Sequence, residues 1–340
     1  MSQKSAEGIC EILSRHYTKV VITTVDNRLD LDKLVARRPD LVFLGMNFII
    51  DDELFDLRSA NKIWLSQYLD DYKIRYTGSD QTAHKLELNK HLAKRQILNS
   101  GLNTSPFYVI YQGNSQNILD VELEFPLFVK PTDRGASLGI DNKSVVHDFD
   151  QLSIKVDSIA SELSADSLIE EYLPGREFSV AVLGNEYSND FSVMPIELVA
   201  PKNKNGDRLL SQEVKSADSE HFIKVTDLAL KARICVLAIN AFHALGARDY
   251  GRIDIRLDRH GIPQFLEANL IPSLLAGYGN FPKACLLNKN LSYQSMLIRI
   301  VYLAFARNYD ASEYIITEEK SRPTLFSKPK SQIPLVIKSI

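Results

Sequence analysis

Apolar and polar positions follow two patterns in turn along the first 50 residues of the chain. Residues 7–19 and 29–39 carry apolar side chains at helical spacing, whereas 19–26 and 40–48 are short apolar runs typical of buried strands. Helices that alternate with strands predict a small parallel sheet with helices on its faces. No strand pattern precedes the first helical run, so the first strand of this unit is either absent or lies before the sequence begins.

The pattern after residue 83 predicts two further lobes. Residues 84–102 are expected to form one helix, 148–164 and 226–247 two more, and 167–185 a pair of strands broken at Pro174-Gly175. Residues 312–340 contain several Pro and Lys and are expected to form a loosely attached tail. The expected division is an amino-terminal lobe over 1–83, a central lobe over 84–183, a carboxy-terminal lobe over 184–311 and the tail.

Two apolar runs within residues 251–273 carry four polar side chains at alternating positions. Arg252 and Asp254 share one face of the first strand, and Glu267 and Asn269 share one face of the second. If the strands pair as a hairpin, the four side chains converge. A surface hairpin with solvated charges is the ordinary alternative. Glu267 argues against it, because a carboxylate within an apolar run is costly to bury without a cation, and such oxygen ligands suit Mg²⁺.

A second candidate site begins where an apolar strand ends at Lys130. Pro131 stops this strand, and the small polar residues of 132–139 follow it, a composition that lets backbone N–H groups approach phosphate oxygens. The pattern is common, and the GxxxxGK[ST] motif is missing. Lys90, on the helix over 84–102, would ordinarily be a solvated lysine. Glu177 and the adjacent acids before it would ordinarily be exposed on a hairpin.

Composition excludes several classes of protein. The chain has 340 residues, 45% of them hydrophobic, and a net charge of −3, so neither disorder nor a nucleic-acid partner is indicated. Cys10, Cys235 and Cys285 are far apart and predict reduced, buried thiols of a cytoplasmic protein. The polar amino terminus shows no signal peptide, and no apolar run reaches the roughly 18 residues that a membrane span needs.

Taken together and in order, these motifs resemble the ATP-grasp superfamily, and within it the D-alanine–D-alanine ligases, over about residues 59–300. The resemblance is carried by YTGS (76–79), the Asn89-Lys90 pair, VKPTDRGASLG, LIEEYLPGREFSV and the hairpin GRIDIRLDRHGIPQFLEANLIPS. It implies an α/β (α+β) ATP-grasp fold. A small amino-terminal lobe with a parallel sheet would accompany two lobes that clasp ATP between antiparallel sheets.

The resemblance also implies roles for individual residues. Lys90 and Lys130 would contact the ATP phosphates, and loop 132–139 would close as a lid. Arg252 would stabilise the oxyanion of a tetrahedral intermediate, and Ser137 and Lys215 would join it as catalytic residues. The nucleotide would contact the Glu170 side chain at the adenine amino group, the backbone of Glu171 and Leu173 at the ring edge, and Glu177 at the ribose. Two Mg²⁺ ions, or Mn²⁺, would be held by Asp254, Glu267 and Asn269.

The sequence departs from the family pattern at positions that orient the two D-alanines. The family's Ser-Ala-Glu stretch is retained only as Ser5-Ala6-Glu7, and Asn47 stands at a histidine position. Ala136 replaces the first serine of the phosphate loop. The mobile loop has Val214-Lys215-Ser216 in place of Ala-Lys-Tyr, and Pro272-Ser273-Leu274 replaces Pro-Gly-Met. The ATP and metal positions, by contrast, are all retained, which favours retained chemistry with changed substrates.

The expected function is an ATP-dependent ligase that joins a small carboxylate to an amine or amino acid through an acyl phosphate. Two alternatives stay open: a divergent D-alanine–D-alanine ligase of cell-wall synthesis, and an ATP-binding sensor or partner protein without turnover. The expected partners are small molecules, with no nucleic acid and no membrane. The resemblance leaves a homodimer open.

Overall fold

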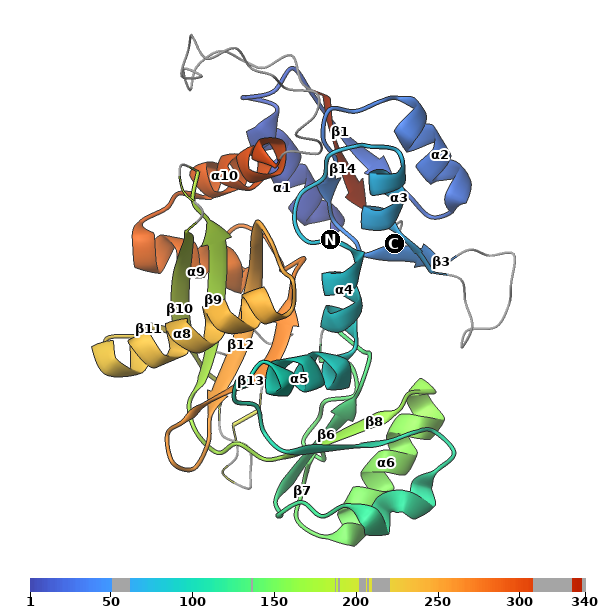
Figure 1. The fold of residues 1–340 in the computed structure, drawn as a ribbon, viewed down its shortest axis with the longest axis vertical. Helices are drawn as coiled ribbons and strands as arrows, with labels where there is room; N and C mark the ends of the chain where they lie inside the picture. The colour runs from blue at the N-terminus through green and yellow to red at the C-terminus, as the bar shows by residue number, and fades with distance from the viewer. Residues whose placement is uncertain are drawn as a thin grey trace.

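The computed structural model describes residues 1–50, 62–135, 137–186, 188, 190–201, 206, 208–209, 221–307 and 332–337. Figure 1 shows three lobes: the amino-terminal lobe at the top, a five-stranded sheet with its helices below it on the left, and a four-stranded sheet with α6 at the bottom. Within the described residues, no helix is both long and apolar enough to span a bilayer. The three cysteines are free thiols; Cys285 is buried, whereas the expectation of burial is wrong for Cys10 and Cys235, which are half-buried.

The amino-terminal lobe contains a three-stranded parallel sheet with helices packed against it. Its elements are α1 (Gln3–Leu13), β1 (Lys19–Thr24), α2 (Arg28–Ala36), β2 (Phe43–Leu44), β3 (Phe48–Ile50), β4 (Lys62–Trp64) and α3 (Leu65–Asp71). The pair β3 and β4 forms a separate antiparallel ribbon. The parallel sheet and its alternation with helices confirm the sequence pattern, but the sheet has the order β1-β14-β2.

The middle strand of this sheet is β14 (Gln332–Ile337), from the opposite end of the sequence. It pairs in parallel with all of β1, from Lys19 opposite Gln332 to Thr24 opposite Ile337, and with both residues of β2. Figure 1 shows β14 in red beside the blue β1. The expectation of a loosely attached tail is therefore wrong for these six residues, which supply the strand that the amino-terminal pattern lacks.

The apolar side chains of β14 explain its position. Ile333, Leu335 and Ile337 point into the core formed with α1 and α10, and Val336 points into the core on the other face. A strand buried on both faces reads as a continuous apolar run, which is typical of parallel sheets. Pro334 lacks an N–H donor, and it lies in the half of β14 that β2 does not pair with.

The central lobe is a four-stranded antiparallel sheet, in the order β5-β8-β6-β7, packed on a helix. This part of the chain forms α4 (Gln81–Leu88), α5 (Lys90–Asn99), β5 (Phe107–Ile110), η1 (Ser115–Asp120), β6 (Leu127–Pro131), β7 (Val145–Val146), α6 (Phe149–Leu163) and β8 (Ser167–Glu171), of which α4 and α5 pack against the core of the carboxy-terminal lobe. The single helix expected over 84–102 is wrong: the chain leaves helical geometry at Asn89, with φ −119° and ψ 85°. The break places Lys90 at the first position of α5.

The carboxy-terminal lobe is a five-stranded antiparallel sheet in the order β11-β10-β9-β12-β13. Its elements are β9 (Glu177–Gly184), β10 (Phe191–Val199), β11 (His221–Lys224), α8 (Leu228–Ala244), β12 (Tyr250–Leu257), β13 (Pro263–Asn269), α9 (Asn280–Lys289) and α10 (Tyr293–Ala306). The predicted helix over 226–247 is confirmed as α8, which Asp227 caps by accepting the N–H of Leu230 at 3.0 Å. Together with α9 and α10, α8 covers the sheet on both faces.

Candidate active site

The strand β12 presents two chemically different faces. Ile253 and Ile255 are fully buried in the core under α8. Arg252, Asp254 and Arg256 occupy the alternate positions and line a pocket on the opposite face, between the central and carboxy-terminal lobes. Because side chains alternate along a strand, one face of β12 packs in the core and the other face supplies polar side chains to the pocket.

The pairing of β12 with β13 confirms the hairpin predicted from the sequence. Arg252 lies opposite Asn269, and Asp254 lies opposite Glu267. The register then shifts, so that Leu266 has no partner residue on β12, and both Leu266 and Glu267 line the pocket. Such an irregularity changes the direction of side chains and is frequent beside active sites.

Asp254 is held by three neighbouring side chains. Arg252 binds it through two donors, Nε to Oδ1 at 3.0 Å and Nη2 to Oδ2 at 2.9 Å. Asn269 donates to Oδ2 at 3.1 Å, and Ser179 of β9 donates to Oδ1 at 2.8 Å. Asp254 is only 7% exposed, so the alternative of a solvated surface hairpin is wrong.

The oxygen atoms of this patch suit Mg²⁺ only together with a phosphate ligand. No group of three or more His, Cys, Asp or Glu side chains that could hold a metal occurs within the described ranges. Asp254 and Glu267 supply two carboxylates, and Asn269 adds an amide oxygen. Mg²⁺ commonly takes one or two carboxylates plus substrate phosphates and water, so this donor set fits.

A buried carboxylate lies between two buried lysines at the other side of the pocket. Glu170 of β8 contacts Lys130 of β6 at 2.7 Å and Lys94 of α5 at 2.5 Å. Burial alone would raise the pKa of Glu170, but the two ammonium groups outweigh it and hold that pKa below its usual value. Burial lowers the pKa of Lys130, and the carboxylates of Glu170 and Glu267 more than reverse this. Lys130 and Glu170 therefore face each other as charged groups.

Lys90 lies at the start of α5, beside the predicted phosphate loop. It is 8% exposed, so its interpretation as an ordinary solvated lysine is wrong. Its Nζ donates to the carbonyl of Arg134 at 2.5 Å, and its backbone N–H donates to the carbonyl of Thr132 at 3.0 Å. Burial lowers the pKa of Lys90, and the positive charge of Lys130 adds to that effect while Glu267 opposes it.

The loop after β6 is held close to the sheet by one glycine. Gly139 has a positive φ of 79°, and a Cβ there would lie 2.7 Å from Pro131 and 2.8 Å from Leu163. Ser137 also has a positive φ, of 61°, and lines the pocket. The loop therefore turns back over the end of β6, beside Lys130.

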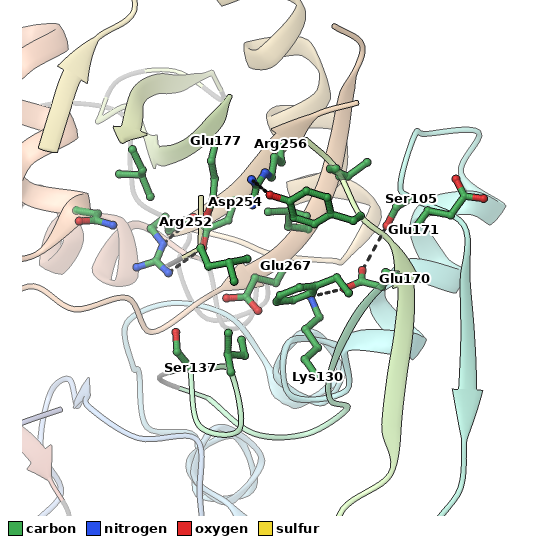
Figure 2. Close-up of a pocket in the computed structure, with 18 residues that line it drawn as sticks. Ser105, Lys130, Ser137, Glu170, Glu171, Glu177, Arg252, Asp254, Arg256 and Glu267 are labelled. Atoms are coloured by element: carbon green, nitrogen blue, oxygen red, sulfur yellow. Dashed lines mark hydrogen bonds and ion pairs between the residues drawn. The ribbon is translucent and has the colours of Figure 1, made fainter. Parts of the chain in front are cut away.

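Most residues predicted for the site line this one pocket. Figure 2 shows their side chains around a common space. The predicted residues in the lining are Lys130, Ser137, Glu170, Glu171, Leu173, Glu177, Arg252, Asp254 and Glu267. Two of the predicted residues that the structure describes do not line the pocket. Asn269 hydrogen-bonds to Asp254, and Lys90 interacts electrostatically with Lys130 and Glu267. Lys215, with the rest of Val214-Lys215-Ser216, and Ala136 lie outside the described residues.

Sequence reasoning missed two charged residues of the site. Lys94 is fully buried, and its spacing of four from Lys90 in α5 was the available signal. Arg256 continues the alternating face that starts with Arg252 and Asp254, and this periodicity could have identified it.

The positions that depart from the family pattern make contacts of their own. Glu7 is exposed and accepts a hydrogen bond from Gln3 at 2.9 Å. Asn47 donates to Glu87 at 3.4 Å, and Glu87 also accepts the N–H of Leu270 at 2.6 Å. Glu87 thus connects the amino-terminal lobe to the segment that follows the β12–β13 hairpin.

Comparisons with known proteins agree with this geometry. The family model described as "D-ala D-ala ligase C-terminus" matches residues 97–302. An uncharacterized protein, y4sG, of Sinorhizobium fredii is 32% identical over 205 residues, which cover 59% of this chain and 58% of that protein. The D-alanine–D-alanine ligase of Hydrogenovibrio crunogenus is 29% identical over 236 residues, which cover 69% of this chain and 71% of that protein.

The fold also matches solved structures. The D-alanine–D-alanine ligase of Bacillus anthracis superimposes with a TM-score of 0.68 at 20% identity, covering 89% of this chain and 94% of that protein. A structure of that ligase complexed with ATP gives a TM-score of 0.65 at 18% identity, with the same coverage. At this identity the match shows the fold, and it confirms the ATP-grasp architecture expected from the sequence.

Proposed function

Because the chain belongs to the family described as the D-ala D-ala ligase C-terminus, we propose that it is an ATP-dependent ligase that joins a small carboxylate to an amine. One observation supports this proposal most strongly. The carboxylates of the buried Asp254 and the half-buried Glu267 face the ammonium group of Lys130 across a single pocket, and Glu170 and Glu267 together raise the pKa of that lysine against the effect of burial. Opposite charges on two lobes are what binding a nucleotide's phosphates together with a cation requires.

The first step would form an acyl phosphate. A substrate carboxylate oxygen attacks the γ-phosphorus of ATP, the bond from that phosphorus to the bridging oxygen breaks, and ADP leaves. Lys90 and Lys130 would place positive charge beside the transferring group. When bound, Mg²⁺ would supply further neutralisation of phosphate charge between Asp254, Glu267 and Asn269.

The second step would form the amide. The amine nitrogen attacks the acyl carbon, the carbon–oxygen bond to phosphate breaks, inorganic phosphate leaves, and the nitrogen loses a proton. Arg252 would stabilise the oxyanion that arises in this attack. Burial lowers the pKa of its guanidinium, but Asp254 and Glu267 more than reverse this, so Arg252 is charged.

The substrates are proposed to differ from two D-alanines. Ser137 and the loop around it would shield the acyl phosphate from water. Glu7 points to solvent instead of contributing to the pocket lining, and Asn47 binds Glu87. Three further predictions are part of this proposal. Lys215 would act as a catalytic residue, and Glu170, Glu171 and Leu173 would contact the adenine. The protein would form a homodimer.

The test is an ADP-release assay. The protein is incubated with ATP, Mg²⁺ and a panel of carboxylates and amines, with Glu267→Gln as the variant expected to lose turnover. Stimulation of ADP release by a carboxylate–amine pair supports the proposal, and dependence on D-alanine alone would return the chain to D-alanine ligation. Nucleotide-dependent thermal stabilisation without turnover on any substrate would instead favour the ATP-binding sensor.

A further inference from the structure

The guanidinium of Arg256 connects several separate segments at one end of the pocket. Its side chain is 8% exposed. Nε donates to the carbonyl of Gly175 at 3.2 Å, and Nη1 donates to Oε2 of Glu177 at 3.3 Å. Nη2 donates to the hydroxyl of Tyr172 at 3.2 Å and to the carbonyl of Arg208 at 2.8 Å. One side chain of β12 therefore contacts residues 172–177, the interlobe connection from β8 to β9 (the hinge), and the segment at Arg208.

These contacts use the shape of arginine and not only its charge. The donors of a guanidinium lie in a fixed plane, so they can reach acceptors in different directions at once, which an ammonium group cannot do. The guanidinium carbon also lies 5.1 Å from the centre of the Tyr172 ring, within range of a cation–π contact. A Cβ at position 175 would lie 2.5 Å from the carbonyl oxygen of Leu257, so only glycine fits there. The hinge is thus packed directly on β12.

Glu177 is the carboxylate in this cluster, and it lines the pocket. Its side chain is 17% exposed, and Arg256 holds one oxygen, Oε2. A fixed carboxylate can accept a hydrogen bond from a ligand hydroxyl without first losing rotamer freedom. Leu209, next to Arg208, is 4% exposed and lines the same pocket.

We propose that Arg256 is a positioning residue that sets the ribose specificity of the nucleotide pocket. It fixes the Glu177 carboxylate toward the sugar hydroxyls and holds the 172–177 hinge and the Arg208 segment at the rim. This inference rests on the proposed function, because it takes the ligand to be ATP and the partner of Glu177 to be its ribose.

The experiment measures binding of ATP and of 2′-deoxy-ATP and 3′-deoxy-ATP, with Mg²⁺, by calorimetry. Wild type is expected to bind ATP about tenfold more tightly than at least one deoxy nucleotide, because losing one hydrogen bond to a charged acceptor lowers affinity by about this factor. Arg256→Met should weaken ATP binding about tenfold and the deoxy nucleotide less, so that the preference falls to about threefold or lower. Arg256→Lys should keep a preference for ATP that lies between those of Arg256→Met and wild type.

Two further variants separate positioning from general stability. Glu177→Gln should lower the same preference, and Arg256→Met with Glu177→Gln should lower it no further, since the two residues act as a unit. The matched control is Arg259→Met, which removes an arginine that is 62% exposed at the turn of the same hairpin. It should leave the preference unchanged.

The outcomes are distinguishable. If wild type does not bind ATP, the proposed function fails. If wild type binds ATP without any preference, or Arg256→Met weakens all three nucleotides equally, the role of Arg256 is overturned while ATP binding stands. If Arg256→Met does not fold, as judged by its unfolding transition, the preference of Arg256→Lys decides: an unchanged ratio overturns the proposal and a reduced one supports it.

Discussion

The two sheets that meet at the core of this protein are built in opposite ways. In the five-stranded sheet, most strands that pair are also neighbours in the chain, as in β9 with β10 and β12 with β13; the exception is the pairing of β9 with β12. In the amino-terminal sheet, the middle strand comes from the far end of the sequence. The first arrangement fixes the candidate site by local register, and the second fixes a whole lobe by one long-range pairing.

This difference has an energetic consequence. A hairpin closes a short loop, and its register is set by its turn and by alternation. The pairing of β14 closes almost the entire chain, so its cost in loop entropy is larger and must be offset by burial. Leu335 and Val336 are fully buried on opposite faces, and each belongs to a different core. The six residues of β14 should therefore contribute to stability far more than their number suggests.

The largest expected effect is that of Leu335→Asp. The change removes a fully buried side chain and places a carboxylate between α1 and α10, at a cost of at least about 5 kcal/mol, comparable with the whole stability of many proteins. Because the same core includes Ala181 and Leu183 of β9, the loss should reach the site. Urea unfolding followed by circular dichroism, and thermal shift by ATP, would measure both.

A matched substitution on the neighbouring strand sharpens this test. Val21 of β1 is 37% exposed and pairs with Pro334. Val21→Asp should cost only about 1 kcal/mol, the range of strand preferences at an exposed position. Equal loss in both variants would show that β14 has no special role in joining the lobes.

The second prediction concerns the buried charges in the central lobe. Glu170→Gln leaves Lys94 and Lys130 close together without their carboxylate, so we expect a loss of about 3–5 kcal/mol in the free energy of unfolding. The control is Glu124→Gln, which breaks the ion pair between Glu124 and Arg259, two side chains that are 73% and 62% exposed, and it should leave the free energy of unfolding nearly unchanged. Similar losses would mean that Glu170 is more solvated than its contacts indicate.

The comparison also separates what sequence could and could not predict. The convergence of Arg252, Asp254, Glu267 and Asn269 followed from alternation and a turn, because every step was local. The ATP-grasp fold and most of the pocket lining followed from the order of several motifs. Sequence also showed no strand pattern before the first helix of the amino-terminal lobe, but it could not identify β14 as a strand of that sheet, since periodicity carries no information about distant partners.

Other differences arise from contacts with segments that are distant in the sequence. The helix break at Asn89 is invisible to apolar periodicity, which continues through α4 and α5, and it is stabilised by a bond from the Lys90 N–H to Thr132 on another segment. Lys94 was not predicted as a site residue, because the carboxylate that binds it, on Glu170, is distant in sequence. Charged residues buried through distant partners are therefore the part of the site that sequence alone does not reveal.

The third prediction tests the hairpin by activity. Arg252→Ala should lower kcat about 10²–10³-fold while changing the KM for ATP by no more than about threefold, because the charge it stabilises arises after ATP has been consumed. Steady-state kinetics with a productive carboxylate–amine pair measures the split. Since Arg252 also binds Asp254, the unfolding transition of the variant must be recorded. Equal losses in kcat and in ATP affinity would contradict the assigned role.

The smallest expected effect is a pH dependence that belongs to Glu170. Its pKa in the folded protein lies below the ordinary value of 4.5, because the two lysine ammonium groups outweigh its burial. At acidic pH the unfolded chain therefore binds more protons than the folded one, and stability rises with pH. The contribution is fully present above about pH 5 and is lost as the pH falls below 4.5 toward the folded pKa.

The measurement is the free energy of unfolding of wild type and of Glu170→Gln between about pH 3 and 7. The difference between them should be constant above about pH 5 and should shrink on acidification by at most about 1.4 kcal/mol per pH unit, the limit for one proton. A difference that grows on acidification would mean that the folded pKa is raised and that Glu170 is protonated between the lysines. In that case Lys130 would face the pocket without a charged partner on Glu170, and the contrast with the carboxylate-bearing hairpin opposite would be stronger still.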